Sequence, residues 1–302
     1  MPFVVNTDVR LYVEETGEGD AIVWLHEFAA DFRTWEQQVR RFSRHYRCVT
    51  YNARGYPPSD VPYDDAAYTY EHHREDLRAI LDALGIDRAH IVGLSMGAYA
   101  GLQFALSYPH RAASLVFASG GSGAPAAGAE TFRRDVREGA ERMLAEGMDA
   151  AAAGLALGAT RLQLAAKDPR GWAEFRQYLA EHSAEGSART LRNYQAMRPS
   201  LYDFSHQLAE LDVPVLVAAG DEDDPVLDVS LFLKRTLPRA GLWVHPKAGH
   251  GLNLEEPDAF NAMVGNFLHA VERDRWPRRD PRARPGRSAF MGDKIDVPQG
   301  GA

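Results

Sequence analysis

The stretch Ala89-His-Ile-Val-Gly-Leu-Ser-Met-Gly-Ala98 decides the fold of this chain. It begins with an apolar run that is typical of a buried strand, and a helical pattern follows it. Between the two lies Gly93-Leu-Ser-Met-Gly97, in which glycines flank a serine two positions away on each side. A serine on a sharp strand-to-helix turn needs such small neighbours, because larger side chains would collide with the adjacent backbone. The pattern predicts that Ser95 is a nucleophile at the end of a sheet strand.

Apolar strands and amphipathic helices alternate on both sides of this turn. We expect strands at 9–13, 21–25, 47–51, 89–92, 114–118, 213–219 and 241–245. We expect helices at about 33–42, 70–84, 98–108 and 257–272. This order predicts an α/β fold with a mostly parallel sheet flanked by helices.

The alternation stops near Gly120. Residues 121–211 contain no strand-like run, are rich in Ala, Arg and Glu, and predict four or five helices. We therefore expect a helical cap inserted into an α/β core of residues 1–120 and 212–273. The Pro and Arg content of residues 274–302 predicts an irregular tail.

Composition excludes several classes of protein. The 302 residues are 45% hydrophobic and 25% charged, which is ordinary for a soluble globular protein. The net charge of −8 argues against general nucleic-acid binding. No apolar stretch predicts a membrane span or a signal peptide. The single cysteine, Cys48, excludes an intramolecular disulfide and a cysteine-based metal cluster. We expect a cytoplasmic protein that acts on a small molecule, without metal, cofactor, nucleic acid or membrane; formation of a homo-oligomer stays open.

A serine hydroxyl is a weak nucleophile and needs a base that a third group orients. His250 is the candidate base, because it lies in the glycine-rich loop Ala248-Gly-His-Gly251 between the last expected strand and the last helix. The candidate acids follow the preceding expected strand and are Asp221, Asp223 and Asp224.

In combination, these motifs resemble the α/β-hydrolase fold family with a helical cap, over about residues 9–268. The resemblance is carried by His26-Glu-Phe28, Arg54-Gly55, Ser59-Asp60, Gly93–Gly97, the acid loop after Gly220, and Ala248-Gly-His250 with Asn253-Leu-Glu-Glu-Pro257. In similar proteins the acid lies three positions after the strand-ending glycine. The resemblance therefore implies Asp223 as the acid, with Asp224 and Asp221 as alternatives. It also implies that the backbone N–H groups of Phe28 and Met96 form an oxyanion hole.

Glu27 departs from the family pattern, in which a glycine follows the histidine and tolerates backbone angles that glutamate disfavours. Its side chain either points away and makes a structural hydrogen bond, or lies near the pocket, where it repels anionic groups or orients a water. His26, Glu27, Trp172 and Tyr178 are candidate pocket residues; core packing is the alternative for the two aromatic residues. One inward-facing arginine of the insert would bind a carboxylate through two parallel hydrogen bonds, the candidates being Arg161, Arg189, Arg192 and Arg198.

The resemblance implies a serine hydrolase that cleaves a carboxylic ester or lactone of a small molecule through an acyl-enzyme. The same triad serves hydrolysis of carbon–carbon bonds in diketones, hydrolysis of enol-lactones and cofactor-free perhydrolysis, so these remain alternatives. A ligand receptor with a slow triad is the alternative from a different class. For an enzyme, we expect changes in the cap to alter selectivity and to spare the chemistry.

Overall fold

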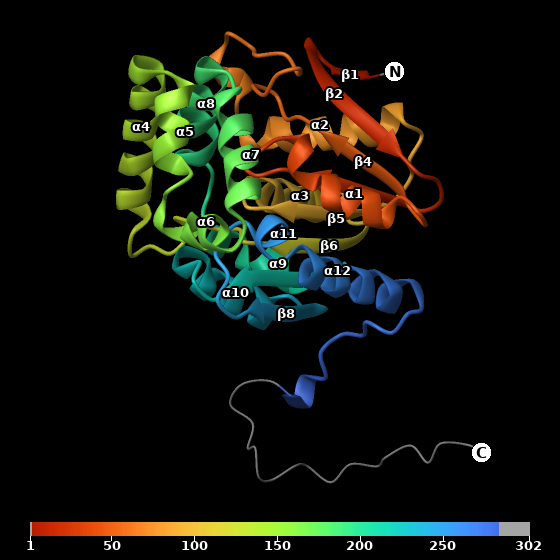
Figure 1. Ribbon diagram of the computed structural model, residues 1–302. Helices are drawn as coiled ribbons and strands as arrows, with labels where there is room; N and C mark the ends of the chain where they lie inside the picture. Colours follow the sequence, from red (N-terminus) through yellow and green to blue (C-terminus); the bar gives the residue numbers. More distant parts are fainter. Residues whose placement is uncertain (1, 284–302) are drawn as a thin grey trace, which may run out of the picture.

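An eight-stranded sheet forms the centre of the computed structural model, which describes residues 2–283 (Figure 1). The strands are Phe3–Asn6 (β1), Val9–Thr16 (β2), Ala21–Leu25 (β3), Arg47–Tyr51 (β4), Ala89–Leu94 (β5), Ala112–Ala118 (β6), Val215–Gly220 (β7) and Ala240–His245 (β8). They lie in the order β1-β2-β4-β3-β5-β6-β7-β8. β2 pairs antiparallel with β1 and β4, and all neighbouring pairs from β4 to β8 are parallel. The mostly parallel α/β sheet predicted from the sequence is thereby confirmed.

Helices cover both faces of the sheet and fill the crossovers. The α-helices are Glu36–Phe42 (α1), Tyr70–Ala83 (α2), Met96–Ser107 (α3), Ala129–Glu146 (α4), Met148–Leu155 (α5), Leu162–Lys167 (α6), Pro169–Ala180 (α7), Ala184–Arg189 (α8), Ser205–Glu210 (α9), Asp224–Thr236 (α10), Leu252–Glu255 (α11) and Pro257–Glu272 (α12). The 3-10 turns are Phe32–Trp35 (η1), Asp65–Ala67 (η2), Ala159–Arg161 (η3), Leu201–Phe204 (η5) and Pro281–Ala283 (η6), and a π-helix spans Thr190–Gln195 (η4). No helix within residues 2–283 combines the length and the apolar character that crossing a membrane requires.

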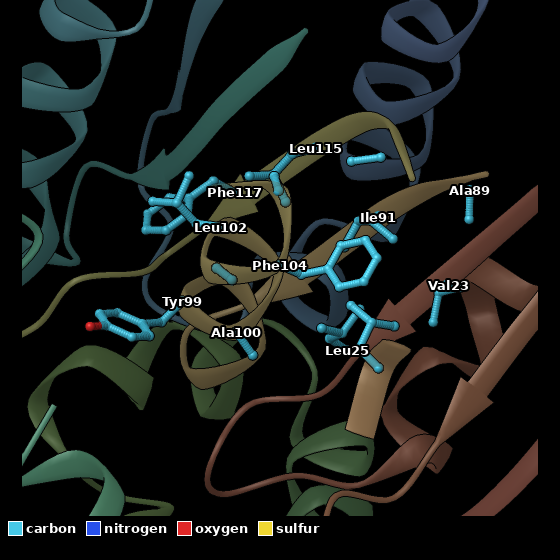
Figure 2. Close-up of a cluster of buried hydrophobic side chains, with 14 of the residues drawn as sticks. Val23, Leu25, Ala89, Ile91, Tyr99, Ala100, Leu102, Phe104, Leu115 and Phe117 are labelled. Carbon is cyan, nitrogen blue, oxygen red and sulfur yellow. The ribbon is translucent and has the colours of Figure 1, made fainter. Parts of the chain in front are cut away.

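The two faces of the sheet bury separate apolar clusters, because successive side chains of a strand point to opposite faces. In β3, Val23 and Leu25 join a cluster with residues of α2, α3 and α10. Figure 2 shows part of this cluster, with Phe104 of α3 packed between the strands and its own helix. Trp24 lies on the opposite face, in a cluster with residues of α1 and α12. β3 is buried along its whole length, as expected of a central parallel strand.

A helical region is inserted between β6 and β7. Helices α4 to α9 occupy it, and α4, α5, α7 and α8 stand together at one side of the molecule in Figure 1. These helices bury an apolar cluster of their own, to which Phe175, Leu179 and Met143 belong. The insert was expected from the sequence, and the boundaries 121–211 for a cap and 1–120 with 212–273 for a core stay a prediction.

Strand β1 and helix α10 were not predicted from the sequence. β1 is an edge strand of the sheet and pairs with β2, and α10 begins directly after Asp223 of the acid loop. The first residues of the predicted tail are docked on the core: the Trp276 indole donates a hydrogen bond to the carbonyl of Arg239, and its ring packs on Phe267. The rest of that tail, 284–302, lies outside the described residues.

Candidate active site

Ser95 lies on a strained turn between β5 and α3. Its φ is 53° and its ψ is −107°, a left-handed backbone conformation that non-glycine residues adopt at a cost. The Ser95 N–H donates to the Ala118 carbonyl at 2.8 Å, and the Ser95 carbonyl accepts from the Tyr99 N–H at 3.1 Å. These bonds tie the turn to β6 and to the first turn of α3, and so fix the place of the serine.

The two glycines of the turn are required by close backbone contacts. A Cβ at Gly93 would lie 2.4 Å from the carbonyl oxygen of Gly97. A Cβ at Gly97 would lie 2.2 Å from the carbonyl oxygen of Leu25 in β3. Rigid backbone oxygens leave no room for either atom, which is the steric reason for the glycines that the sequence analysis assumed.

Of the three acids in the loop after β7, the structure brings Asp223 to the histidine. Asp223 is 1% exposed, and its Oδ2 lies 2.7 Å from Nδ1 of His250. Asp221 and Asp224 are exposed. Burial disfavours the imidazolium, but the charge and hydrogen bond of Asp223 and the charge of Glu27 outweigh it, so the pKa of His250 is raised.

The loop that carries His250 is held from two sides. The backbone N–H of His250 donates to the carbonyl of Thr160 in η3 at 2.8 Å. Glu255 of α11 accepts the N–H groups of Gly249 and Gly251, at 2.7 and 3.1 Å. Glu255 belongs to the motif Asn253-Leu-Glu-Glu-Pro257, from which no role was predicted for it; its position five residues after His250 is the signal in the sequence.

Ser95 and His250 line one cavity of about 720 Å³, whose other walls come from the insert, from residues 27–29 after β3, and from the acid loop with the start of α10. This volume is within the range of small-molecule sites. Among the described residues the Ser95 hydroxyl has no hydrogen-bond partner, so the bond between Ser95 and His250 is not formed here. Such bonds are often long without substrate and tighten only when substrate binds.

Phe28 and Met96, the residues expected to supply the oxyanion hole, both contact the hydroxyl of Tyr56. The Tyr56 hydroxyl donates to the Phe28 carbonyl at 2.9 Å and lies 4.0 Å from the Met96 sulfur. Within residues 2–283, neither the N–H of Phe28 nor that of Met96 has a protein acceptor. Both amides are therefore available to an oxyanion, and that role stays a proposal.

His26 was expected in the pocket, and the structure places it outside the cavity lining, in the loop of residues 26–28 after β3, which we call the oxyanion loop. Its Nε2 accepts the N–H of Ala53 at 3.0 Å, so its Nδ1 carries the proton and donates to the Glu27 carbonyl at 2.7 Å. Burial lowers the pKa of His26 to about 4. A neutral ring with both nitrogens bound to backbone serves to hold the loop.

Glu27 lines the cavity and is 2% exposed. Its carboxylate forms two parallel hydrogen bonds with Arg161 of the insert, one of them 2.8 Å long. Of the four arginines named from the sequence, Arg161 and Arg198 line the cavity. Arg161 is the one that binds a carboxylate through two hydrogen bonds, and that carboxylate belongs to the protein itself. Glu27 is absent from the described non-glycine residues with positive φ, so its replacement of glycine brings no backbone strain.

Trp172 and Tyr178 were expected to line the pocket and do not line this cavity. α7 turns Phe175 and Leu179 into the core of the insert, and Trp172 packs partly buried against the same cluster. The Trp172 indole donates to the Ala156 carbonyl at 2.7 Å, and the Tyr178 ring lies under the guanidinium of Arg33 at 4.0 Å. The residues of the insert that line the cavity instead include Phe132, Leu191 and Arg161, which the helical spacing of the sequence does not single out.

No group of three or more His, Cys, Asp or Glu side chains in residues 2–283 is placed to hold a metal ion.

Comparison with known proteins identifies the family. A family model described as alpha/beta hydrolase fold matches residues 20–257. A 2-hydroxy-6-oxononadienedioate/2-hydroxy-6-oxononatrienedioate hydrolase of Burkholderia vietnamiensis is 31% identical over 278 residues, which cover 87% of this chain and 92% of that protein. The enol-lactonase of Burkholderia xenovorans LB400 is 25% identical, with a TM-score of 0.77 over 89% of this chain and 100% of its own. A thermophilic esterase of Thermogutta terrifontis is also 25% identical, with a TM-score of 0.78 over 89% of this chain and 98% of its own. Because the family match spans most of the sequence and includes the serine turn and the His250 loop, the chain belongs to the alpha/beta hydrolase fold family.

Proposed function

We propose that the protein is a serine hydrolase that cleaves a carboxylic ester or lactone of a small molecule through an acyl-enzyme. The observation that carries the proposal is the 2.7 Å hydrogen bond between Asp223 and His250 on the wall of the cavity that Ser95 also lines. The nucleophile thus follows β5, the orienting acid follows β7 and the base follows β8. In parallel sheets these carboxyl ends of strands are where ligands bind.

In this mechanism the Ser95 oxygen attacks the acyl carbonyl while His250 Nε2 takes the hydroxyl proton. Asp223 holds the tautomer in which Nδ1 carries a proton, and it stabilises the imidazolium. The N–H groups of Phe28 and Met96 stabilise the negative oxygen of the tetrahedral intermediate. The imidazolium then gives its proton to the leaving alcohol, and a water hydrolyses the acyl-enzyme by the same route in reverse.

Carbon–carbon bond hydrolysis is the second candidate, because the relative from Burkholderia vietnamiensis is named as a hydrolase of a dienedioate and the chains are 31% identical. The esterase favours the first candidate, and the enol-lactonase favours enol-lactone hydrolysis, which is another of the alternatives. The same serine, base and acid serve both reactions. Steady-state rates on an aryl ester, a lactone and a ring-cleavage diketone rank the candidates directly.

The test of the proposed function uses Ser95→Ala, with Ser122→Ala as a matched control because Ser122 lines the same cavity. A fluorophosphonate probe should label wild type and Ser122→Ala and leave Ser95→Ala unlabelled. Ester turnover should fall by about 10⁴-fold or more in Ser95→Ala alone. Labelling that persists in Ser95→Ala, or wild type that reacts once without steady-state turnover on any member of the panel, would refute the proposal; the second result would indicate a receptor.

A further inference from the structure

A buried ion pair joins the oxyanion loop to the insert beside the histidine. Glu27 follows β3, and Arg161 ends η3, 134 residues later in the chain. The Glu27 carboxylate is 2% exposed and the Arg161 side chain 10%. The ring of Phe175 lies under the Arg161 guanidinium at 4.8 Å. A pair so removed from water is costly unless its geometry is good, and here both carboxylate oxygens have a guanidinium partner.

The same carboxylate faces His250. Glu27 Oε2 lies 3.6 Å from Nε2 of His250, while Asp223 Oδ2 lies 2.7 Å from Nδ1. The imidazole is therefore held between two carboxylates, one at each nitrogen. η3 contacts this arrangement twice, since Thr160 accepts the His250 backbone N–H and Arg161 binds Glu27.

We propose that the Glu27–Arg161 pair positions the proposed catalytic histidine: Glu27 stabilises the proton-bearing Nε2 of His250, and Arg161 holds Glu27 in place and offsets its charge beside the oxyanion site. This inference rests on the proposed function. Glu27 and Arg161 are positioning residues here, because they act through His250.

The charges make both halves of the pair necessary. When Nε2 takes the Ser95 proton, the imidazolium that forms lies beside the Glu27 carboxylate. At this distance, opposite charges attract strongly in a buried site. Glu27 also precedes Phe28, a donor to the oxyanion, where an uncompensated carboxylate would repel the developing negative charge. Arg161 reduces that repulsion without removing the carboxylate from Nε2. Burial alone would raise the pKa of Glu27, but Arg161 and His250 outweigh burial and lower it.

Other titratable groups surround His250 and are unchanged in the variants below. They are Asp223 at Nδ1, Asp224 and Asp228 of α10, Asp135 of α4 and Arg198 on the cavity wall, Glu255 of α11 behind the loop, and His26 in the oxyanion loop. Lys167 of α6 forms an ion pair with Glu256 and lies outside the cavity lining. Lys167→Gln therefore breaks another contact between insert and core and is the matched control.

The test is the pH profile of kcat/KM on an aryl ester. Neutral His250 is the base, so the rate rises as the pH passes through its pKa. Glu27→Gln removes the negative charge at Nε2, and the acid limb should move to lower pH by about one pH unit. Arg161→Gln removes the opposing positive charge, and the limb should move to higher pH, with Arg161→Lys restoring it. The double variant should lie between the two single variants, and Lys167→Gln should keep the wild-type profile.

Folding is checked by thermal denaturation, and the nucleophile by fluorophosphonate labelling of every variant. Single variants that share one direction of shift, or leave the limb in place while still labelled at Ser95, overturn the inference and leave the proposed function standing. If Glu27→Gln does not fold, Arg161→Gln decides alone: a limb that stays in place or moves to lower pH overturns the inference. Loss of labelling in wild type would instead overturn the proposed function.

Discussion

Asp223→Asn measures how much the orienting acid contributes to the proposed reaction. Asp223 is 1% exposed and bonds to Nδ1 of His250 at 2.7 Å, so its charge acts on the imidazolium with little solvent screening. With charge centres about 4 Å apart and an effective dielectric constant of about 20, the attraction is about 4 kcal/mol. That energy corresponds to about 10³-fold in rate. The asparagine amide would also favour the tautomer whose Nε2 carries the proton, which cannot accept a proton from serine.

The assay is kcat/KM on an aryl ester, with circular dichroism to confirm folding. Asp221→Asn and Asp224→Asn are the controls, because both side chains are exposed. We expect both controls to stay within about threefold of wild type, since exposed charges are screened by solvent. A loss of less than about tenfold in Asp223→Asn, or a comparable loss in Asp224→Asn, would show that the observed hydrogen bond is not the catalytic one.

Three further predictions test the turn, the insert and the oxyanion loop. Gly97→Ala should abolish folding or activity, because the new Cβ would lie 2.2 Å from a carbonyl oxygen of β3. The control Gly154→Ala should keep both, because a Cβ there has nothing within 4 Å. Expression level and ester turnover check this prediction. Phe132→Ala should change the preference between short and bulky esters by about 1–3 kcal/mol in kcat/KM, because Phe132 lines the cavity. Trp172→Ala should lower the Tm and keep the wild-type ranking of esters. An unchanged ranking of esters in Phe132→Ala would contradict the assigned cavity. His26 is neutral in the fold with a pKa of about 4 and titrates near 6.5 when unfolded, so its contribution to stability is present above pH 6.5 and is lost towards pH 4. The difference in unfolding free energy between wild type and His26→Gln should narrow by about 3 kcal/mol over that range in urea titrations; a constant difference would refute it.

The parts that the sequence predicts well are those set by local sterics and chain order. The glycines around Ser95 reflect contacts with backbone oxygens, which the spacing of the motif already encodes. The sheet follows from buried apolar runs such as Ala21–Leu25, which has no exposed residue. The choice of Asp223 over Asp221 and Asp224 as the acid rests on the resemblance. Local sequence does not distinguish three acids so close together, because they differ only in the direction of their side chains.

The errors concern partners that are distant in the chain. Helical spacing groups Trp172, Phe175, Tyr178 and Leu179 but does not say which face of α7 meets a cavity, because the partner helix decides that. Helix α10 went unnoticed, although Val226, Val229 and Leu233 are buried on one face at helical spacing. Its start coincides with the acid loop, where the same residues were interpreted for their chemistry.

Glu27 and Arg161 bear on the expectation that changes in the cap spare the chemistry, because the proposed positioning role would exempt η3 from it. The sequence presents a glutamate where similar proteins have glycine, and separately an arginine able to bind a carboxylate; the structure joins them beside His250. No residue of α7 lines the cavity, and α7 reaches the ion pair only through Phe175, whose ring lies under the Arg161 guanidinium. η3 supplies both the Thr160 carbonyl that anchors His250 and the guanidinium that binds Glu27. In the proposed reaction, a movement of η3 that breaks these two contacts also changes the surroundings of His250, because the insert forms one side of the site around this base.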